Sequence, residues 1–440
     1  MTAVRLRVRT EPIDEADPLL RRADPRTPLV WLRRGEGMIG LGETLRIEST
    51  GPGRIDDAGA AWAELAELAD VDDRVGLPGT GLIAFGAFAF ADDSASTSVL
   101  VVPELVLGKR DGRSWLTRIE LVPGGRGSGA DAGAAPEPAG APGGIHSPDT
   151  YTDTDAPGIP EPAPRRRAPR IAFEPAALPP AAYEAAVAEA VRRIDAGELE
   201  KVVLARTQQG ELHEEDGLRA VLGSLADDYP DTWVFAVDGL IGASPETLVR
   251  VDHGTVSARV LAGTAPRGGD EEADRVSAAE LAASAKSRSE HALAVASAVK
   301  RLEPHTARLD ASPEPFTLQL PNLWHLATDL KGTLGDGSDA LDLVRAVHPT
   351  AAVAGTPRKK AVAAIAELEG FDRGRYAGPV GWIDGGGDGE WAIALRSAQV
   401  GDDGRVTAFA GCGIVHDSVP ADELAETVLK FRPIVDAFGG

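Results

Sequence analysis

The sequence predicts an α+β fold in which large, mostly antiparallel β-sheets pack as a sandwich flanked by helices. Three observations support this prediction. Apolar, β-branched runs bounded by turn-forming residues are numerous in the 440-residue chain. Helical patterns are fewer and longer. Regular strand–helix–strand alternation, which would indicate a parallel sheet, is rare.

Residues 1–122 are predicted to form an N-terminal α/β part of the fold. Strands are expected over 82–90 and 115–122, and a helix over 60–68. From 123 to 170 the composition changes to Gly, Ala, Pro, Asp and Ser, which cannot bury enough apolar area to fold. This stretch is predicted to be a flexible surface excursion. Its run Arg165-Arg166-Arg167 is expected to be solvated.

Residues 171–440 are predicted to form a second, larger domain. Tyr183, Val187, Val191 and Ile194 recur at helical spacing, and Gly197 fits the end of that helix. A strand is expected to begin at Lys201. Further strands are predicted at 233–237, 247–251, 256–261, 391–398 and 406–415, and helices at 271–303, 338–347, 357–369 and 420–437.

Charge and cysteine content narrow the possible functions. A net charge of −23 repels nucleic acid and anionic membranes, so neither is an expected partner. An anionic substrate would need a locally positive pocket or a bound cation. The single cysteine, Cys412, excludes an intrachain disulfide and a cysteine-based zinc site. The chain shows no secretory signal and no apolar run near the ~20 residues of a membrane helix, so a cytoplasmic location is expected. A monomer is the default expectation for its oligomeric state.

Lys201 and Glu246 are the candidate acid–base residues. Lys201 opens an apolar run, where it could be an exposed lysine or, with its pKa lowered by burial or a nearby cation, a general base. Glu246 follows the turn-forming pair Ser244-Pro245. It could be a solvated loop carboxylate or, in a drier setting that raises its pKa, a general acid.

Carboxylates on two predicted helices are candidate metal ligands. Glu290 lies on one helix, and Glu423, Glu426 and Lys430 lie on one face of another. A surface ion pair would explain the spacing of Glu426 and Lys430. Carboxylates from two helices with open positions for substrate are also what Mg²⁺ prefers.

Glycine-rich strand ends and one arginine are candidate contacts for a carboxylate ligand. Gly263, Gly411 and Gly413 allow backbone N–H groups to approach a ligand closely. Arg396, at the end of a strand-like run, could bind a carboxylate through two parallel hydrogen bonds. His325 and Asp329 are expected to be structural.

Taken together and in order, these segments resemble the chorismate-utilising enzymes, which include isochorismate, salicylate, anthranilate and aminodeoxychorismate synthases. The resemblance covers residues 180–437. Its motifs are Lys201-Val-Val-Leu-Ala-Arg206, Ser244-Pro-Glu246, Leu261-Ala-Gly-Thr264, Ser284 to His291, His348-Pro-Thr350, Gly355-Thr-Pro-Arg358, Phe371 to Trp382, the Arg396 and Gly411 strands, and Glu423-x-x-Glu426.

The resemblance implies the fold of that family, with 171–440 as the chorismate-binding catalytic domain, and a role for each candidate. Lys201 would activate water for attack on C2 of chorismate, and Glu246 would protonate the departing C4 hydroxyl. Mg²⁺ on Glu290 and Glu426, supported by Glu423, would hold the ring carboxylate. The remaining substrate contacts would come from Gly263, Thr264, Ala352, Tyr376, Arg396, Gly411, Gly413 and Lys430.

Three positions favour isochorismate synthase, an isomerase that needs no glutaminase partner, within this family. Water-adding members resemble this chain at Lys201, aminodeoxychorismate synthases often carry a lysine at the position of Ala262, and salicylate synthases tend to have threonine at that of Ala352. The alternatives are a salicylate synthase, an ammonia-using component, or a chorismate-binding protein without turnover. Menaquinone and siderophore synthesis are both possible destinations of the product. The chain departs from the family pattern at Ser287, Ala351 and Cys412.

Overall fold

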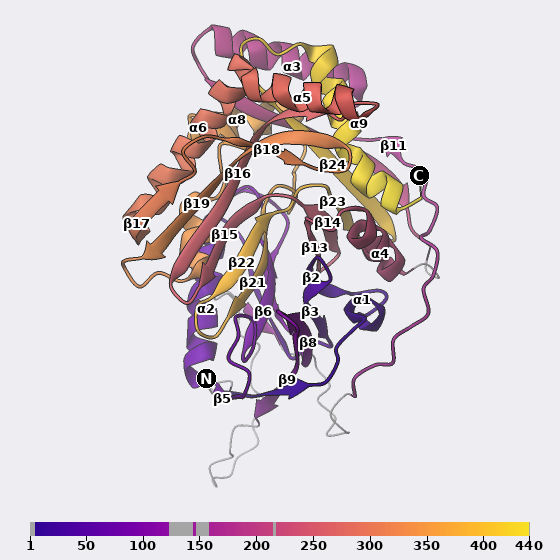
Figure 1. The fold of residues 1–440 in the computed structure, drawn as a ribbon, viewed down its shortest axis with the longest axis vertical. Helices are drawn as coiled ribbons and strands as arrows, with labels where there is room; N and C mark the ends of the chain where they lie inside the picture. The colour runs from indigo at the N-terminus through magenta and orange to yellow at the C-terminus, as the bar shows by residue number, and fades with distance from the viewer. Residues whose placement is uncertain (1–4, 123–143, 147–157, 214–216, 440) are drawn as a thin grey trace, which may run out of the picture.

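Two large β-sheets pack against each other through one hydrophobic core, and helices cover their outer faces (Figure 1). The structure, a computed structural model, describes residues 5–122, 144–146, 158–213 and 217–439. Most of the predicted surface excursion at 123–170 therefore lies outside the described residues. Its described part contains a three-residue strand at 144–146 and, from 158 to 170, neither helix nor strand.

The first sheet has 13 strands and contains both the beginning of the chain and the segment that starts at Lys201. In spatial order its strands are β11 (Glu174–Pro175), β12 (Lys201–Glu211), β24 (Arg405–Ile414), β23 (Ser397–Val400), β14 (Leu240–Ser244), β13 (Trp233–Val237), β2 (Leu29–Arg33), β3 (Glu36–Leu41), β8 (Leu105–Arg110), β9 (Arg113–Val122), β1 (Arg5–Ile13) and β5 (Asp70–Asp73), with β20 (Gly355–Thr356) paired to β12.

The second sheet has 11 strands and again combines N-terminal and C-terminal segments. In spatial order these are β10 (Gly144–His146), β4 (Leu45–Ser49), β7 (Ser98–Val102), β6 (Ile83–Ala87), β21 (Pro379–Asp384), β22 (Gly389–Ile393), β15 (Thr247–Asp252), β16 (Thr255–Pro266), β19 (Leu323–Leu334) and β17 (Thr306–Ala311), with β18 (Phe316–Gln319) paired to β19. Among the described residues, every strand pair in both sheets is antiparallel except β1 with β5.

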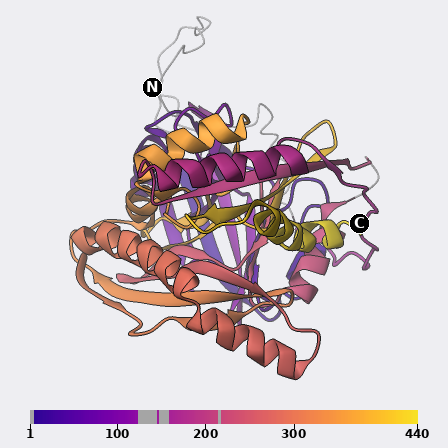
Figure 2. The ribbon, with the colours of Figure 1, turned by 90° about the horizontal axis from the view of Figure 1, so that it is seen from above.

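Most helices from the C-terminal two thirds gather at one end of the molecule (Figures 1 and 2). The helices are α1 (Leu19–Arg22), α2 (Arg54–Leu68), α3 (Pro180–Asp195), α4 (Leu218–Asp228), α5 (Glu271–Ala283), α6 (Ala285–Leu302), α7 (Ala340–Val347), α8 (Arg358–Glu369) and α9 (Pro420–Ala437), with a 3₁₀ turn at Glu303–His305. Helices α5 and α6 pack on β16, whereas α3, α8 and α9 pack on β12 or β24. The α+β prediction is confirmed, and the helices at this end surround the strands that carry most candidate residues.

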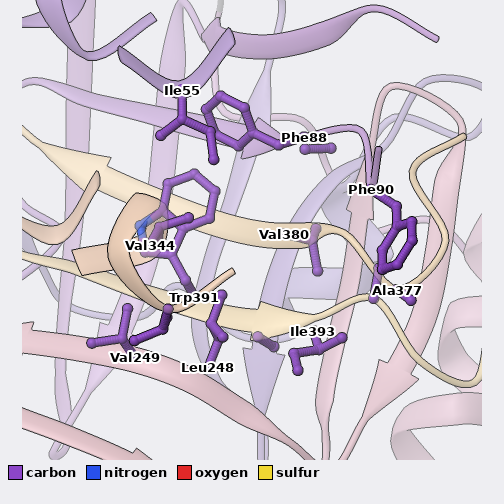
Figure 3. Packing of buried hydrophobic residues seen from close by; sticks show 14 of the residues in the cluster. Ile55, Phe88, Phe90, Leu248, Val249, Val344, Ala377, Val380, Trp391 and Ile393 are labelled. Atoms are coloured by element: carbon purple, nitrogen blue, oxygen red, sulfur yellow. The ribbon is translucent and has the colours of Figure 1, made fainter. Parts of the chain in front are cut away.

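Large aromatic side chains fill the space between the sheets. Trp31 and Trp115 come from the first sheet, and Phe85 and Trp391 come from the second, all of them fully buried. Figure 3 shows Phe88, Trp391 and Val344 converging in this core, and the ring centroids of Phe88 and Trp391 lie 5.5 Å apart. A second apolar cluster lies on the other side of the first sheet, under α4 and α9. Strands covered on both faces, such as β13, are continuously apolar, which is why the sequence shows them as unbroken runs.

Two predicted elements prove to be interrupted. The helix predicted over 271–303 ends at Ala283, because Ser284 adopts an extended conformation and its side chain caps the next helix by accepting from the backbone N–H of Ser287. The strand predicted over 391–398 divides into β22 and β23, which belong to different sheets. The chain passes between the sheets at 394–396, where Arg396 has a φ of +50°.

Among the described residues, the helices are all too short or too polar to cross a membrane.

Two glycine substitutions test the packing between the sheets. A Cβ at Gly86 would lie 2.5 Å from the Trp391 ring and 2.7 Å from Leu100, so Gly86→Ala is expected to lower the free energy of unfolding by about 1–3 kcal/mol. At Gly59, inside α2, a Cβ meets nothing closer than Leu341 at 3.8 Å. Gly59→Ala should therefore raise that free energy by about 0.5–1 kcal/mol. Urea unfolding followed by circular dichroism measures both, and equal effects would contradict the packing described.

Candidate active site

The candidate site forms where two neighbouring segments of the chain pass from one sheet to the other. Between β14 and β15 the crossing contains Pro245 and Glu246, and between β22 and β23 it contains Arg396. Hydrogen bonds join the two crossings: the Ser244 hydroxyl donates to the carbonyl of Ile393 at 2.6 Å, and the Ile393 N–H donates to the carbonyl of Glu246 at 3.2 Å. Glu246 and Arg396 are thereby held in one space between the sheets.

Arg396 is a buried cation with no carboxylate partner among the described residues. Its Nη2 donates to Nε2 of His325 at 3.1 Å, and Nδ1 of His325 lies 3.2 Å from the carbonyl of Gly263. Burial, together with the charges of Arg396 and Lys430, holds the pKa of His325 well below its usual value. His325 is therefore neutral, and the positive charge of Arg396 remains available for an anionic ligand.

Glu246 lies in a setting that keeps its carboxyl group protonated near neutral pH. The residue is 4% exposed, and burial raises its pKa to about 8, although Lys201 and Arg396 act in the opposite direction. A protonated carboxyl group close to an unpaired cation is suited to donate a proton to a bound ligand. Glu246 is therefore not a solvated loop carboxylate.

Lys201 is buried and touches a carboxylate from another helix. The residue is 1% exposed, and its Nζ lies 2.8 Å from Oε1 of Glu290 on α6. Gly413 on the neighbouring strand β24 makes room for this pair, because a Cβ there would lie 2.6 Å from Oε1 of Glu290 and 2.8 Å from Cε of Lys201. Lys201 is therefore not an exposed lysine at the start of a strand.

The acidic residues of α9 differ in their partners. Glu426 lies 2.6 Å from Nζ of Lys430; burial raises the Glu426 pKa, but Lys430 and a hydrogen bond with Thr264 outweigh burial and lower it overall. Burial and the charge of Glu426 raise the pKa of Glu423 to about 7, although Ser418 donates a hydrogen bond to Glu423 at 2.7 Å. The negative charge of Glu426 is therefore balanced by Lys430, whereas burial and the neighbouring Glu426 favour the protonated form of Glu423.

One cavity of about 190 Å³ collects the predicted site residues. Twelve of the thirteen line it: Glu246, Gly263, Thr264, Glu290, Ala352, Tyr376, Arg396, Gly411, Gly413, Glu423, Glu426 and Lys430. Lys201 contacts this lining through Glu290. Many of the side chains on this wall are charged or polar, although the cavity adjoins the apolar core. Such a wall suits a small charged ligand.

Glycine and aromatic residues shape the cavity walls. Gly263 has a φ of +85° at an irregularity in the pairing of β16 with β19, a conformation that favours glycine. Tyr376 stacks on Phe409 with ring centroids 4.9 Å apart. Ala352 also lies on the wall, so its small side chain leaves space in the cavity.

A fully buried ion pair supports one side of the cavity. Nε of Arg373 donates to Glu369 at 2.9 Å, and other nitrogens of Arg373 donate to the carbonyls of Val353 and Val203, each at 2.9 Å. Glu369 also accepts from the N–H of Ala205 at 2.7 Å. The pair therefore ties α8, the loop at 353 and strand β12 together, which fixes the start of the strand that carries Lys201.

Sequence reasoning missed three ionisable residues of the cavity wall, His325, Arg373 and Lys286. His325, for which the sequence predicts a structural role, faces Thr264 across the β16–β19 pair. A histidine within an apolar strand could have signalled a site, but only the strand register shows which residue it faces. Nζ of Lys286 lies 3.7 Å from Glu423, so a further cation stands beside the acidic wall.

Two of the three predicted metal ligands, Glu423 and Glu426, lie close together on this wall, whereas the third, Glu290, pairs with Lys201 and is outside their cluster. Glu423 and Glu426 present ligand atoms within 4.8 Å of each other, together with Cys412. Burial raises the pKa of the Cys412 thiol well above its ordinary value, so this group stays protonated and is a poor ligand. The remaining donors are carboxylates, as Mg²⁺ prefers.

Comparisons with known proteins identify the family of this chain. The family model described as "Chorismate binding enzyme" matches residues 150–439. The putative isochorismate synthase MenF of Mycobacterium tuberculosis is 42% identical over 286 residues, covering 62% of this chain and 77% of that protein. The isochorismate synthase DhbC of Bacillus subtilis is 38% identical over 59% of this chain and 68% of its own length.

Solved structures extend the similarity to nearly the whole chain. A putative 2,3-dihydroxybenzoate-specific isochorismate synthase, DhbC, from Bacillus anthracis matches 97% of this chain and 100% of its own, with a TM-score of 0.74 and 28% identity. Anthranilate synthase component I from Streptococcus pneumoniae matches in fold, with a TM-score of 0.68 and 20% identity over 92% of each chain. This chain belongs to the chorismate-binding enzyme family.

Proposed function

We propose that the protein is an isochorismate synthase, which converts chorismate to isochorismate by adding water at C2 with loss of the C4 hydroxyl. The observation that carries this proposal is a buried lysine and a buried, protonated glutamate at one cavity, Lys201 and Glu246. Water is a weak nucleophile and needs a base, whereas the C4 hydroxyl is a poor leaving group and needs an acid. Relatives named isochorismate synthase at 37–42% identity support the proposal.

The cations of the cavity suit the two carboxylates of chorismate. Arg396, which no carboxylate of the described residues neutralises, would bind the enolpyruvyl carboxylate together with Tyr376. The backbone at Gly411 and Gly413 comes close enough to the cavity to add N–H donors. Thr264 and Lys430 would contact the ring carboxylate. The substrate would then lie with C2 toward Lys201 and its C4 hydroxyl toward Glu246.

Mg²⁺ is the cofactor that the acidic wall fits, with Glu290 and Glu426 as ligands and Glu423 in support. Bound there, it would neutralise these carboxylates and bind the ring carboxylate of the substrate. Glu290 also contacts Lys201 at 2.8 Å, so one carboxylate serves both the proposed ligand set and the proposed base. With Glu290 bound to a cation, Lys201 would lack the carboxylate partner that it has in this structure.

Each proton has a defined donor and acceptor in the proposed reaction. Lys201 removes a proton from water as the oxygen bonds to C2. The double bonds of the ring shift, the C4–oxygen bond breaks, and Glu246 donates its proton to the departing hydroxyl. Water has then been added and released, so the substrate and product are isomers.

Replacement of Lys201 tests the proposed base. Because an acid or base group typically contributes ~10²–10⁴-fold to rate, Lys201→Ala should lower isochorismate formation by about that factor. Chromatography of the products measures this with chorismate and Mg²⁺ present. Lys331→Ala, at an exposed lysine on β19, is the matched control and should retain the wild-type rate. Wild-type turnover by Lys201→Ala would refute the mechanism, and salicylate as the main product would favour the salicylate synthase alternative.

The pH profile tests Glu246 as the acid. Its carboxyl group must be protonated to donate, and its pKa is raised to about 8, so kcat/KM should fall as pH rises through about 8. Glu246→Gln keeps the shape of the side chain but has no acidic proton, and should lose ~10²–10⁴-fold in rate together with this alkaline decline. A wild-type profile that stays flat through this range, or an unchanged decline in Glu246→Gln, would show that another group is the acid.

A further inference from the structure

A second and larger cavity lies apart from the candidate active site. Its volume is about 870 Å³, and it is enclosed by α1, α4 and the segment 158–170. This cavity and the candidate active site have no lining residue in common. Small-molecule sites typically measure roughly 300–1,000 Å³, so the size suits an organic ligand.

The charge of this cavity is opposite to that of the whole chain. Eight arginines line it, against two aspartates, although the chain carries a net charge of −23. Both aspartates already have partners: Asp17 pairs with Lys109, and Asp227 lies 3.2 Å from Arg165. Asp227 compensates only one of the eight arginines, and Arg34 pairs with Asp231 outside the lining, so a local excess of positive charge remains.

Three of the arginines are free to bind a ligand. The side chains of Arg26, Arg166 and Arg167 are exposed and make no hydrogen bond or ion pair with any part of the chain that the structure describes. Arg166 and Arg167 belong to the arginine run that the sequence analysis expects to be solvated. Guanidinium groups bind carboxylates and phosphates through paired N–H donors, so three free groups around one cavity favour an anion.

Backbone hydrogen bonds hold the arginine run over the cavity. On one side of the run, the N–H of Ala163 donates to the carbonyl of Arg21 at 2.9 Å, and Nε of Arg21 donates to the carbonyl of Ala163 at 2.6 Å. On the other side, Ile171 is buried and its N–H donates to the carbonyl of Phe438 at 3.1 Å. The cost of ordering this segment is therefore partly met before any ligand binds.

Apolar groups form much of the remaining wall. Leu20, Leu32, Val234 and Pro230 line the cavity beside the arginines. An inorganic anion would leave these surfaces in contact with water. A flat organic body that carries anionic groups would cover the apolar wall and satisfy the guanidinium groups together.

We propose that this cavity binds a small organic anion, a ring system that carries two phosphate or carboxylate groups. The arginines Arg26, Arg166 and Arg167 contact its anionic oxygens, and the apolar wall contacts its body. The site is separate from the chorismate cavity and does not depend on the function proposed for that cavity.

Calorimetric titration of the full chain tests the site with two probes, ADP for phosphate groups and naphthalene-2,6-dicarboxylate for carboxylates. At least one probe should bind saturably to the wild-type protein. The triple variant Arg26→Ser, Arg166→Ser, Arg167→Ser should bind that probe at least ~10-fold more weakly, since removing one charge-assisted hydrogen bond typically weakens binding by about that factor. Its melting temperature should match that of the wild type, because all three side chains are exposed.

A second triple variant controls for net charge. Lys359→Ser, Lys360→Ser, Arg405→Ser also removes three positive charges, from exposed positions outside the cavity, and should bind the probe as the wild type does. If neither probe binds the wild type, or if both triple variants weaken binding equally, the proposal is wrong. Binding of one probe alone supports the site and identifies which anionic group it prefers.

Discussion

Two crossings of the chain between the sheets determine where the candidate active site lies. Residues 245–246 and 394–396 lie side by side, joined by hydrogen bonds between Ser244, Glu246 and Ile393. Where both strands leave their sheets together, the two sheets can no longer fill the space between them with apolar side chains. Glu246 and Arg396 enter that space from the crossings. The rest of the wall comes from the ends of β12, β16 and β24, from β19, from helices α6 and α9, and from the loops at 352–353 and 373–377.

Burial of unpaired charge gives the cavity its reactivity. Isolated ionised groups are costly to bury, so they shift their pKa or acquire a partner. For Glu246, burial raises the pKa to about 8. Lys201 instead has a partner, because it contacts Glu290. Arg396 has no carboxylate partner among the described residues, and its side chain donates to His325 instead. The chorismate carboxylates would supply the missing compensation, so substrate binding would relieve a cost that folding leaves in place.

Sequence patterns predicted the fold class and most C-terminal elements well, because strands covered on both faces are continuous apolar runs. They failed where local pattern and tertiary structure disagree. The run 391–398 looks like one strand, yet the positive φ at Arg396 divides it between two sheets. Ser284 acts as a cap that breaks an apparently continuous helix.

The sequence predicted which residues gather at the candidate site, but it did not predict how they are arranged there. Motif order placed thirteen residues in one site, and twelve of them line one cavity. The contact between Lys201 and Glu290 joins a proposed base to a proposed metal ligand, which no spacing in the sequence reveals. His325 escaped recognition because its role depends on its register opposite Thr264 and on its contact with Arg396.

The central claim is that solvent water, activated by Lys201, supplies the new hydroxyl of the product. Mass spectrometry of isochorismate formed by the wild-type protein in H₂¹⁸O tests it most directly. The account predicts that one ¹⁸O atom enters at C2 from the first turnovers onward. Isochorismate that forms at the normal rate without the label would mean that the hydroxyl moves within the substrate, and would contradict the account.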